Sequence, residues 1–235
     1  IYKRNRIEKT DQPIVAYFYN EENNEHLRLQ KKEAIRFAIN KQRNVSRTKL
    51  PENMVYIEKL FGGCLLRRAH GMEIHRLINL PLKYRGYIML EVIESVRELL
   101  ENYIYPIDMG NSLYAKDCVV TKNDGTISYS GHSHVFVNLL NRKISIIDLD
   151  GHSAIYTDRY NEEFEKKVFF GLCQLLVEFF LDIDVYDMLD KDYEKDTLAY
   201  YLENAQVKKE YIDSLSIYDL NIDQIEDTVK SLIKK

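Results

Sequence analysis

The sequence contains no tryptophan and only three cysteines among its 235 residues. Cys64, Cys118 and Cys173 are far apart and form no Cys-x-x-Cys pair. Because disulfide frameworks and cysteine zinc sites need paired or regularly spaced thiols, the sequence argues against both kinds of site. Scattered free thiols are typical of a reducing compartment, so we expect a cytoplasmic protein.

Long apolar segments are also missing. The most apolar stretch covers residues 168–181, and Gly171, Gln174 and Glu178 interrupt it. A membrane-crossing helix needs about 20 mostly apolar residues, and the first residues lack the pattern of a signal peptide. With 45% hydrophobic and 30% charged residues, the composition is that of a globular chain with a sizeable core. We therefore expect no membrane partner.

Glycine is scarce in the first quarter of the chain, since none of the nine glycines precedes Gly62. A glycine-rich phosphate loop is therefore absent from residues 1–61. The Gly-x-Ser-x-Gly pattern of a nucleophile elbow is absent as well. Cys64 and Cys173 lie in apolar runs, where a cysteine usually packs as a small hydrophobic residue. The sequence thus offers no support for nucleophilic catalysis.

Charge is distributed unevenly along the chain. Residues 1–86 hold 18 Lys and Arg against 9 Asp and Glu, and residues 87–235 hold 15 against 28. The two parts therefore carry +9 and −13, which gives the overall charge of −4. A basic segment can bind phosphate or nucleic acid, but pairing with the acidic remainder is the interpretation we favour. A stacking surface for nucleic acid needs aromatic residues interleaved with the basic ones, and Tyr17 and Tyr19 are too few to support it, so no clear nucleic-acid partner is predicted.

Apolar periodicity predicts a series of short strands and longer helices. Strands are expected at residues 14–19, 54–61, 64–68, 118–121, 135–138 and 144–147. Helices are expected at residues 25–44, 89–103 and 164–179, and the segment after residue 196 has a helical composition. Gly62 and Gly63 are expected to break a hairpin. Residues 70–79 are expected to be a polar linker with His70 and His75 on its surface.

This order of elements is typical of an α+β protein. We predict a small N-terminal lobe that contains the first strands and a helix, at residues 1–79. A mostly helical C-terminal lobe follows at residues 80–235.

Two carboxylates stand directly after a buried strand in the stretch 144–151, which reads Ile-Ser-Ile-Ile-Asp-Leu-Asp-Gly. Asp148 and Asp150 are expected to emerge where that strand ends, beside Gly151. Carboxylate oxygens in such a place can hold a hard cation such as Mg²⁺. The structural alternative is an acidic turn in which the aspartates only cap the following backbone.

Another carboxylate, Asp108, stands shortly after the expected apolar helix 89–103. Tyr103–Asp108 follows that helix, and the strand 135–138 and then Asp148 come later. This layout resembles the protein-kinase-like superfamily in a reduced, atypical form of a bacterial kinase or pseudokinase type. The resemblance covers about residues 14–185 and implies a two-lobe fold, with a small β-containing lobe and a mainly helical lobe.

The resemblance implies a role for several residues. Asp108 matches the catalytic aspartate that orients the acceptor hydroxyl, and Asp148 matches the aspartate that holds Mg²⁺ against the phosphates of ATP. Asp150 and Asn111 are candidates for further metal ligands. The interlobe hinge that receives adenine corresponds to Leu66, Arg67, Arg68 and Ala69. Helix 25–44 matches the regulatory helix, with Glu33 as the partner of a strand lysine.

The chain departs from the family pattern at several positions. Tyr17 stands where such folds carry a phosphate-gripping lysine, within Val15-Ala16-Tyr17-Phe18. His134 precedes the apolar strand where an asparagine is usual, and imidazole is a poorer Mg²⁺ ligand than an oxygen group. His132 and His134 could form a transition-metal pair. Because a third spaced ligand is missing, we interpret them as loop histidines.

Two classes of function follow. The first is a kinase-like protein that binds ATP and Mg²⁺ and transfers phosphate to a hydroxyl acceptor. The second is a catalytically inactive pseudokinase that acts as an interaction or regulatory module with a protein partner. The retained aspartates favour the first function, and the missing lysine and glycine loop favour the second. An unrelated α+β binding domain with purely structural aspartates is a third, weaker alternative.

Overall fold

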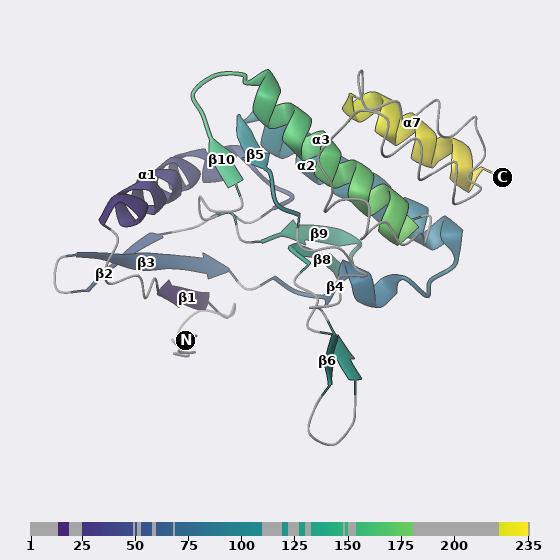
Figure 1. Cartoon of the computed structure of the whole chain (residues 1–235), viewed down its shortest axis with the longest axis horizontal. Coiled ribbons are helices and arrows are strands. Elements are labelled where there is room, and N and C mark those ends of the chain that lie inside the picture. The colour runs from purple at the N-terminus through teal and green to yellow at the C-terminus, as the bar shows by residue number, and fades with distance from the viewer. Residues whose placement is uncertain are drawn as a thin grey trace.

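The computed structural model describes most of the chain between residues 14 and 234. The described residues are 14–18, 25–48, 50, 53–57, 60–67, 69–109, 119–121, 127–129, 133–147, 149, 154–180 and 221–234. They form a mixed structure of helices and small sheets (Figure 1). The predicted α+β class is therefore confirmed.

The first sheet has three antiparallel strands in the order β1-β3-β2. Their bounds are Ile14–Phe18 for β1, Asn53–Ile57 for β2 and Leu60–Arg67 for β3. The expected strands at 54–61 and 64–68 thus become β2 and one long β3. The predicted break at Gly62 and Gly63 is wrong, because both glycines lie inside β3.

These two glycines form a bulge in the sheet. Val55 pairs with Gly63 and Tyr56 pairs with Phe61, so Gly62 is the extra residue of β3. Gly63 has a φ of 155°, a conformation that residues with a Cβ rarely adopt. A glycine pair in a strand pattern can therefore mark a bulge rather than a turn.

Helix α1 (Glu25–Lys41) contacts β2 and β3 and also reaches β10 (Ala154–Tyr156) in the second half of the chain. Its Ile35 and Ala38 side chains are fully buried. The ring of Phe37 lies 5.8 Å from that of Tyr156. A short 3-10 turn, η1 (Gln42–Asn44), ends this helical segment. The predicted helix 25–44 is confirmed as these two elements.

The expected polar linker at residues 70–79 is a packed segment instead. It forms β4 (Met72–Glu73), which pairs with β8 (Val135–Asn138), and a 3-10 turn, η2 (Ile74–Leu77). Ile74 and Leu77 are buried, and the His75 side chain is only 11% exposed. His70 is exposed as predicted, whereas the surface position predicted for His75 is wrong. Ile74 and Leu77, three positions apart, bury this segment, although most of the residues around them are polar.

Helix α2 (Leu82–Glu101) is the centre of the main core. Pro81 is its N-cap residue, so the helix begins seven residues before the expected start at residue 89. The apolar residues that recur at three- and four-residue steps predicted this helix, and five of the seven are buried: Met89, Val92, Ile93, Val96 and Leu99. Leu100 and Tyr103 are partly buried and pack against the same core. The helix ends earlier than predicted, because Tyr103 has a φ of 58° and lies outside it. Lys41 at the end of α1 lies over the Tyr103 ring, 5.5 Å from its centre.

Three small antiparallel sheets complete the β structure. The predicted hairpin 135–147 is confirmed as β8 (Val135–Asn138) and β9 (Lys143–Ile146), with β4 on the other side of β8. A second sheet pairs β5 (Ile104–Pro106) with β10, and neither strand was predicted. The third of these sheets is the hairpin of β6 (Val119–Thr121) and β7 (Ile127–Tyr129), which projects from the body of the chain (Figure 1).

Helix α3 (Glu162–Leu175) continues into the π-helical turn η4 (Leu176–Phe180), which confirms the predicted helix 164–179. Helix α7 (Ile222–Ile233) then packs along α2, so part of the segment after residue 196 is helical as predicted. Gly86 of α2 permits this contact, because a Cβ there would lie 2.0 Å from Cγ2 of Ile233. The acidic segment 182–196 lies outside the described residues.

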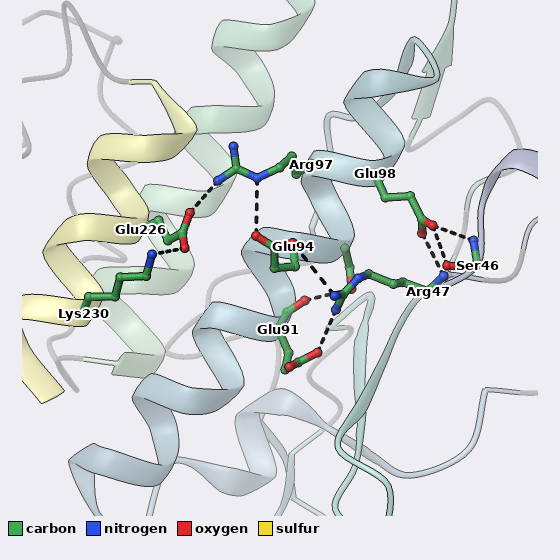
Figure 2. A network of polar contacts seen from close by, with 9 residues as sticks. Ser46, Arg47, Glu91, Glu94, Arg97, Glu98, Glu226 and Lys230 are labelled. Atoms are coloured by element: carbon green, nitrogen blue, oxygen red, sulfur yellow. Dashed lines mark hydrogen bonds and ion pairs between the residues drawn. The ribbon is translucent and has the colours of Figure 1, made fainter.

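A polar network runs along the outer face of α2 (Figure 2). Glu98 accepts hydrogen bonds from both the backbone and the side chain of Ser46, and from the backbone of Arg47. The Arg47 guanidinium donates to Glu91 at 2.8 Å. On the other side, Arg97 bridges α2 to α7 through its contact with Glu226 at 2.6 Å. This network ties the segment after α1, the central helix and the C-terminal helix together.

Candidate functional site

Asp108 lies in a short loop directly after β5. Its side chain is 47% exposed, while the neighbouring Met109 is 5% exposed and belongs to the main core. A buried neighbour fixes the path of the loop and leaves the Asp108 carboxylate turned toward solvent. An exposed carboxylate on an anchored backbone is a suitable arrangement for a group that meets a substrate.

Helix α3 anchors the loop that contains Asp108. Met109 packs against Gly171, where a Cβ would lie 3.1 Å from Cγ of Met109. The hydroxyl of Tyr105 in β5 accepts a hydrogen bond of 2.9 Å from the backbone N–H of Asn161. Asn161 is also the N-cap of α3 and accepts from the backbone N–H of Phe164. The strand that leads to Asp108 is therefore joined to the start of a core helix.

His134 contacts the Asp108 loop in two ways. Its backbone N–H donates to the carbonyl of Met109 at 3.1 Å. Its ring nitrogen Nδ1 lies 3.1 Å from the Asp108 carbonyl oxygen and 3.8 Å from Oδ1 of the Asp108 carboxylate. The His134 side chain is only 13% exposed, so the ring packs between the loop and the start of β8.

The same residue contacts the end of β9. The carbonyl of His134 accepts a hydrogen bond of 2.8 Å from the backbone N–H of Ile147. Two residues further on, the carbonyl of Leu149 accepts a 2.6 Å hydrogen bond from the hydroxyl of Tyr156 in β10. Leu149 is buried in the main core. The structure thus brings the loop at Asp108 and the chain at Ile147 and Leu149 together.

Strand pairing strengthens this arrangement. Tyr156, which holds Leu149, pairs with Ile104 of β5, and Ala154 pairs with Pro106. Asp108 is two residues beyond Pro106 in the same chain direction. The two loops are therefore fixed by one pair of strands on one side and by His134 on the other.

Two of the predicted adenine-binding residues lie within β3. Leu66 pairs with Val15, and Arg67 pairs with Ile14 of β1. Ala69 follows the strand, is partly buried and lies outside regular structure. The chain continues through β4 to the edge of β8, the strand that begins beside His134. The segment from β3 to β4 thus connects the first sheet to the sheet that borders Asp108.

Several predicted site residues lie outside the described residues. They are Asp148, Asp150, Asn111, Arg68 and His132. Their assigned roles in metal or nucleotide binding stay predictions. Glu33, the expected partner of a strand lysine, is on the exposed side of α1. The division into segments 1–79 and 80–235 also stays a prediction, although Ala38, Val45 and Leu50 share one core with α2.

Sequence reasoning treated His134 as a loop residue and gave Tyr156 no role. The sequence did indicate a role for His134, because this residue stands directly before an apolar strand, at the position where the resemblance expects an asparagine. Tyr156 had no such signal. Its contact with Leu149 depends on the three-residue pairing of β5 with β10, which the spacing of residues in the sequence does not reveal.

Two titratable side chains respond to burial. Complete burial raises the pKa of the Cys173 thiol to about 12, which fits the predicted role of this residue as a small packing group. Burial lowers the pKa of His75, against the opposing effect of Glu73. Nδ1 of His75 lies 3.2 Å from Oε2 of Glu73 without forming a hydrogen bond. We assign neither group to the site, because burial accounts for both shifts of pKa.

No protein-family model matches the sequence, and the search of curated proteins gave no match. The solved structure of the bifunctional kinase-methyltransferase WbdD is similar over 96% of this chain and 41% of that chain, with 10% sequence identity and a TM-score of 0.48. The chain thus spans less than half the length of that protein. This is a distant structural similarity to a kinase-containing protein, and it carries no argument about the site.

Within the ranges that the structure covers, no group of three or more histidine, cysteine, aspartate or glutamate side chains could hold a metal ion. None of the helices in the described part of the chain is both long enough and apolar enough to cross a bilayer.

Proposed function

We propose that this chain binds ATP with Mg²⁺ in a kinase-like arrangement of two lobes and transfers phosphate to a hydroxyl acceptor. The observation that carries this proposal is the contact of His134 with both loops. Its ring meets Asp108 and its carbonyl meets Ile147. A carboxylate that orients an acceptor and one that holds a metal must face the same reacting phosphate, so their loops have to be neighbours.

The residues on either side of Asp148 are the described neighbours of the proposed metal ligand. The backbone N–H of Ile147 donates to His134, and the carbonyl of Leu149 accepts from Tyr156. The chain therefore passes close to the Asp108 loop at Ile147. A carboxylate that follows Ile147 in the sequence would suit a metal that needs oxygen ligands.

The donor set fits magnesium rather than a softer metal. Asp148, Asp150 and Asn111 would supply carboxylate and amide oxygens, which are the ligands that Mg²⁺ prefers. When bound, the ion would neutralise negative charge on the phosphates. Backbone groups of Leu66–Ala69 would receive the adenine.

Asp108 would bind the acceptor hydroxyl and orient its oxygen toward the terminal phosphorus of ATP. The bond from that phosphorus to the bridging oxygen of ADP breaks as the bond to the acceptor oxygen forms. The hydroxyl proton passes to the Asp108 carboxylate. Such catalysis depends mainly on positioning and charge neutralisation, so few side chains suffice.

A second function is favoured by one observation in the first sheet. Tyr17 lies in β1, the strand directly before α1, and pairs with Cys64 of β3. The resemblance expects a lysine there to hold phosphate, and a tyrosine cannot supply that charge. A chain that binds nucleotide without transferring phosphate, and that works as an interaction or regulatory module, is therefore the alternative.

A thermal-shift experiment tests nucleotide binding. A ligand that binds only the native state raises stability by mass action, about 2.7 kcal/mol at a concentration 100 times Kd. We expect a rise in melting temperature with ATP and Mg²⁺ together that exceeds the rise with either alone. Asp148→Ala should abolish the added shift, and Asp158→Ala, a change at an exposed aspartate, should preserve it. Equal shifts in both variants would contradict the metal role of Asp148.

Transfer is measured separately with ATP labelled at the terminal phosphate. The proposal expects labelled product, either on the chain itself or on an added hydroxyl acceptor. Nucleotide binding without any transfer would favour the inactive module. The absence of both binding and transfer would reject the kinase-like function and leave the aspartates with structural roles.

A further inference from the structure

His134 has contacts that the proposed roles of the aspartates do not use. Its ring nitrogen Nδ1 lies 3.1 Å from the carbonyl oxygen of Asp108. The separation from the Asp108 carboxylate, 3.8 Å, is too long for a hydrogen bond. The principal interaction of the ring with this loop is therefore with the backbone of Asp108 rather than with its side chain.

This contact fixes the tautomer of the ring. A carbonyl oxygen can only accept a hydrogen bond, so Nδ1 of His134 must carry the proton that it donates. In the neutral imidazole the other nitrogen, Nε2, then has no proton. The geometry thus assigns Nδ1 as a donor to the Asp108 backbone.

The backbone of His134 completes the connection. Its N–H donates to Met109 and its carbonyl accepts from Ile147. With the ring bond to Asp108, one residue makes three hydrogen bonds to two loops. Loss of the ring bond would leave the two backbone bonds in place, so the loop at Asp108 could shift without separation of the two segments.

We propose that His134 is a positioning residue, which holds the Asp108 loop at a fixed distance from the chain around Ile147 through the Nδ1 hydrogen bond. This inference rests on the proposed phosphate transfer. It differs from a metal-ligand role, because imidazole is a weak ligand for Mg²⁺ and the Nδ1 atom is already used by the carbonyl. It also differs from a proton-transfer role, which would require contact with the reacting atoms.

Three substitutions distinguish these roles. In His134→Asn the side-chain amide can place an N–H close to the position of Nδ1. In His134→Gln the amide is one bond further out, nearer to the position of Nε2, and His134→Leu removes the donor while it retains an apolar side chain of similar bulk. The positioning role needs a donor at the Nδ1 position, so the asparagine variant should be the rescue variant.

The expected kinetic result follows from the sensitivity of catalysis to alignment. A misplacement of about 1 Å can lower the rate about 100-fold. We therefore expect kcat to fall about 100-fold in the leucine and glutamine variants and less than about 10-fold in the asparagine variant. KM for ATP should change little in all three, because the hinge that would receive adenine is untouched. Equal loss in the asparagine and leucine variants would overturn the inference.

The ring tautomer provides a readout that does not depend on turnover. In the full chain with ¹⁵N-labelled histidine, the nitrogen spectrum of neutral His134, identified by the signals lost in His134→Asn, should show the proton on Nδ1. A proton on Nε2 would overturn the positioning role. If the wild-type chain transfers no phosphate, the proposed function fails, but the spectrum still tests the Nδ1 bond.

Discussion

The loop at Asp108 and the outer face of α2 both join segments that are far apart in sequence, but they use different groups to do so. On α2, side chains make the bonds, as when the Arg97 guanidinium contacts Asp223 at 2.7 Å and Glu226 at 2.6 Å. Around Asp108, His134 bonds to backbone groups of Asp108, Met109 and Ile147. The carboxylate of Asp108 stays 47% exposed.

The outer face of α2 therefore resembles a stabilising surface, whereas the Asp108 loop resembles a functional site. The charged groups on this face of α2 are engaged with groups of the protein itself, which leaves them little capacity for a ligand. The Asp108 loop is fixed through its backbone and through Met109, and the Asp108 side chain is 47% exposed, so its carboxylate can face a substrate.

The largest expected effect is catalytic and falls on Asp108. Asp108→Asn should lower phosphate transfer by about 10²–10⁴-fold, the usual contribution of a positioned acid or base. Because the side chain is half-exposed, the free energy of unfolding should change by less than about 0.5 kcal/mol. Asp158→Asn is the matched control and should preserve both quantities. A large loss of stability in Asp108→Asn would assign the residue to the fold instead.

The next largest effect concerns the contact between α2 and α7. Gly86→Leu would drive a side chain into Ile233 and toward Phe180, whose Cε2 lies 3.1 Å from the Cβ position. Overpacking of this kind costs about 1–3 kcal/mol, seen as a lower midpoint in urea unfolding. Tyr87→Leu, at a neighbouring position that is 46% exposed, is the control and should have little effect.

A double substitution sharpens this test. Ile233→Ala removes the group that clashes, so Gly86→Leu should be less destabilising in that background. The two changes should therefore be non-additive, as expected for residues in contact. Additive losses would mean that α7 does not pack against Gly86.

A smaller effect is expected at Arg97. Arg97→Ala removes contacts with Asp223, which is 73% exposed, and with Glu226, which is 18% exposed. Exposed ion pairs contribute little, so we expect a loss of about 1 kcal/mol that shrinks in high salt. Lys83→Ala, at an exposed position on the same helix, is the control. Phosphate transfer should be unchanged, since this face of α2 is separate from the Asp108 loop.

The smallest effect is the pH dependence of Glu98. Burial tends to raise the pKa of this carboxyl, but hydrogen bonds from Ser46 and Arg47 outweigh it and hold the pKa below the usual 4.5. A lowered native pKa stabilises the fold above the unfolded value, and that stabilisation disappears as the pH falls through the native value. Glu98→Gln should therefore cost about 1 kcal/mol at pH 7 and little at lower pH.

Acid titration of stability checks this prediction. The difference between wild type and Glu98→Gln should be constant above pH 4.5 and vanish below the lowered pKa. Glu101→Gln, on the exposed face at the end of α2, should show a much smaller difference. A constant difference across the whole range would mean that the Glu98 charge does not contribute.

The helices and the hairpin could be predicted because their signals are local. The apolar positions of α2 recur every three or four residues, and the hairpin β8–β9 has two short apolar runs around a polar turn. The β5–β10 pair was missed because each strand has three residues and Pro106 disfavours a strand assignment. The pairing partners are about 50 residues apart, so no local pattern reports them.

The candidate site was predicted in part for the same reason. The order of Asp108, an apolar strand and Asp148 is visible in the sequence, and the structure brings the loop of the first next to the residues that flank the last. The role of His134 could not be predicted, because its side chain acts on a backbone carbonyl 26 residues away. Backbone contacts of this kind depend on the folded path and not on residue type.

One measurement tests the central claim most directly. Mn²⁺ can replace Mg²⁺ beside ATP, and its unpaired electrons broaden the NMR signals of nearby nuclei. In the ¹⁵N-histidine chain, we predict that Mn²⁺ with ATP broadens the His134 ring signals in wild type and in Asp158→Ala. The broadening should be lost in Asp148→Ala. Sharp His134 signals in the presence of bound Mn²⁺ and ATP would contradict the account, because the metal would then lie away from the Asp108 loop.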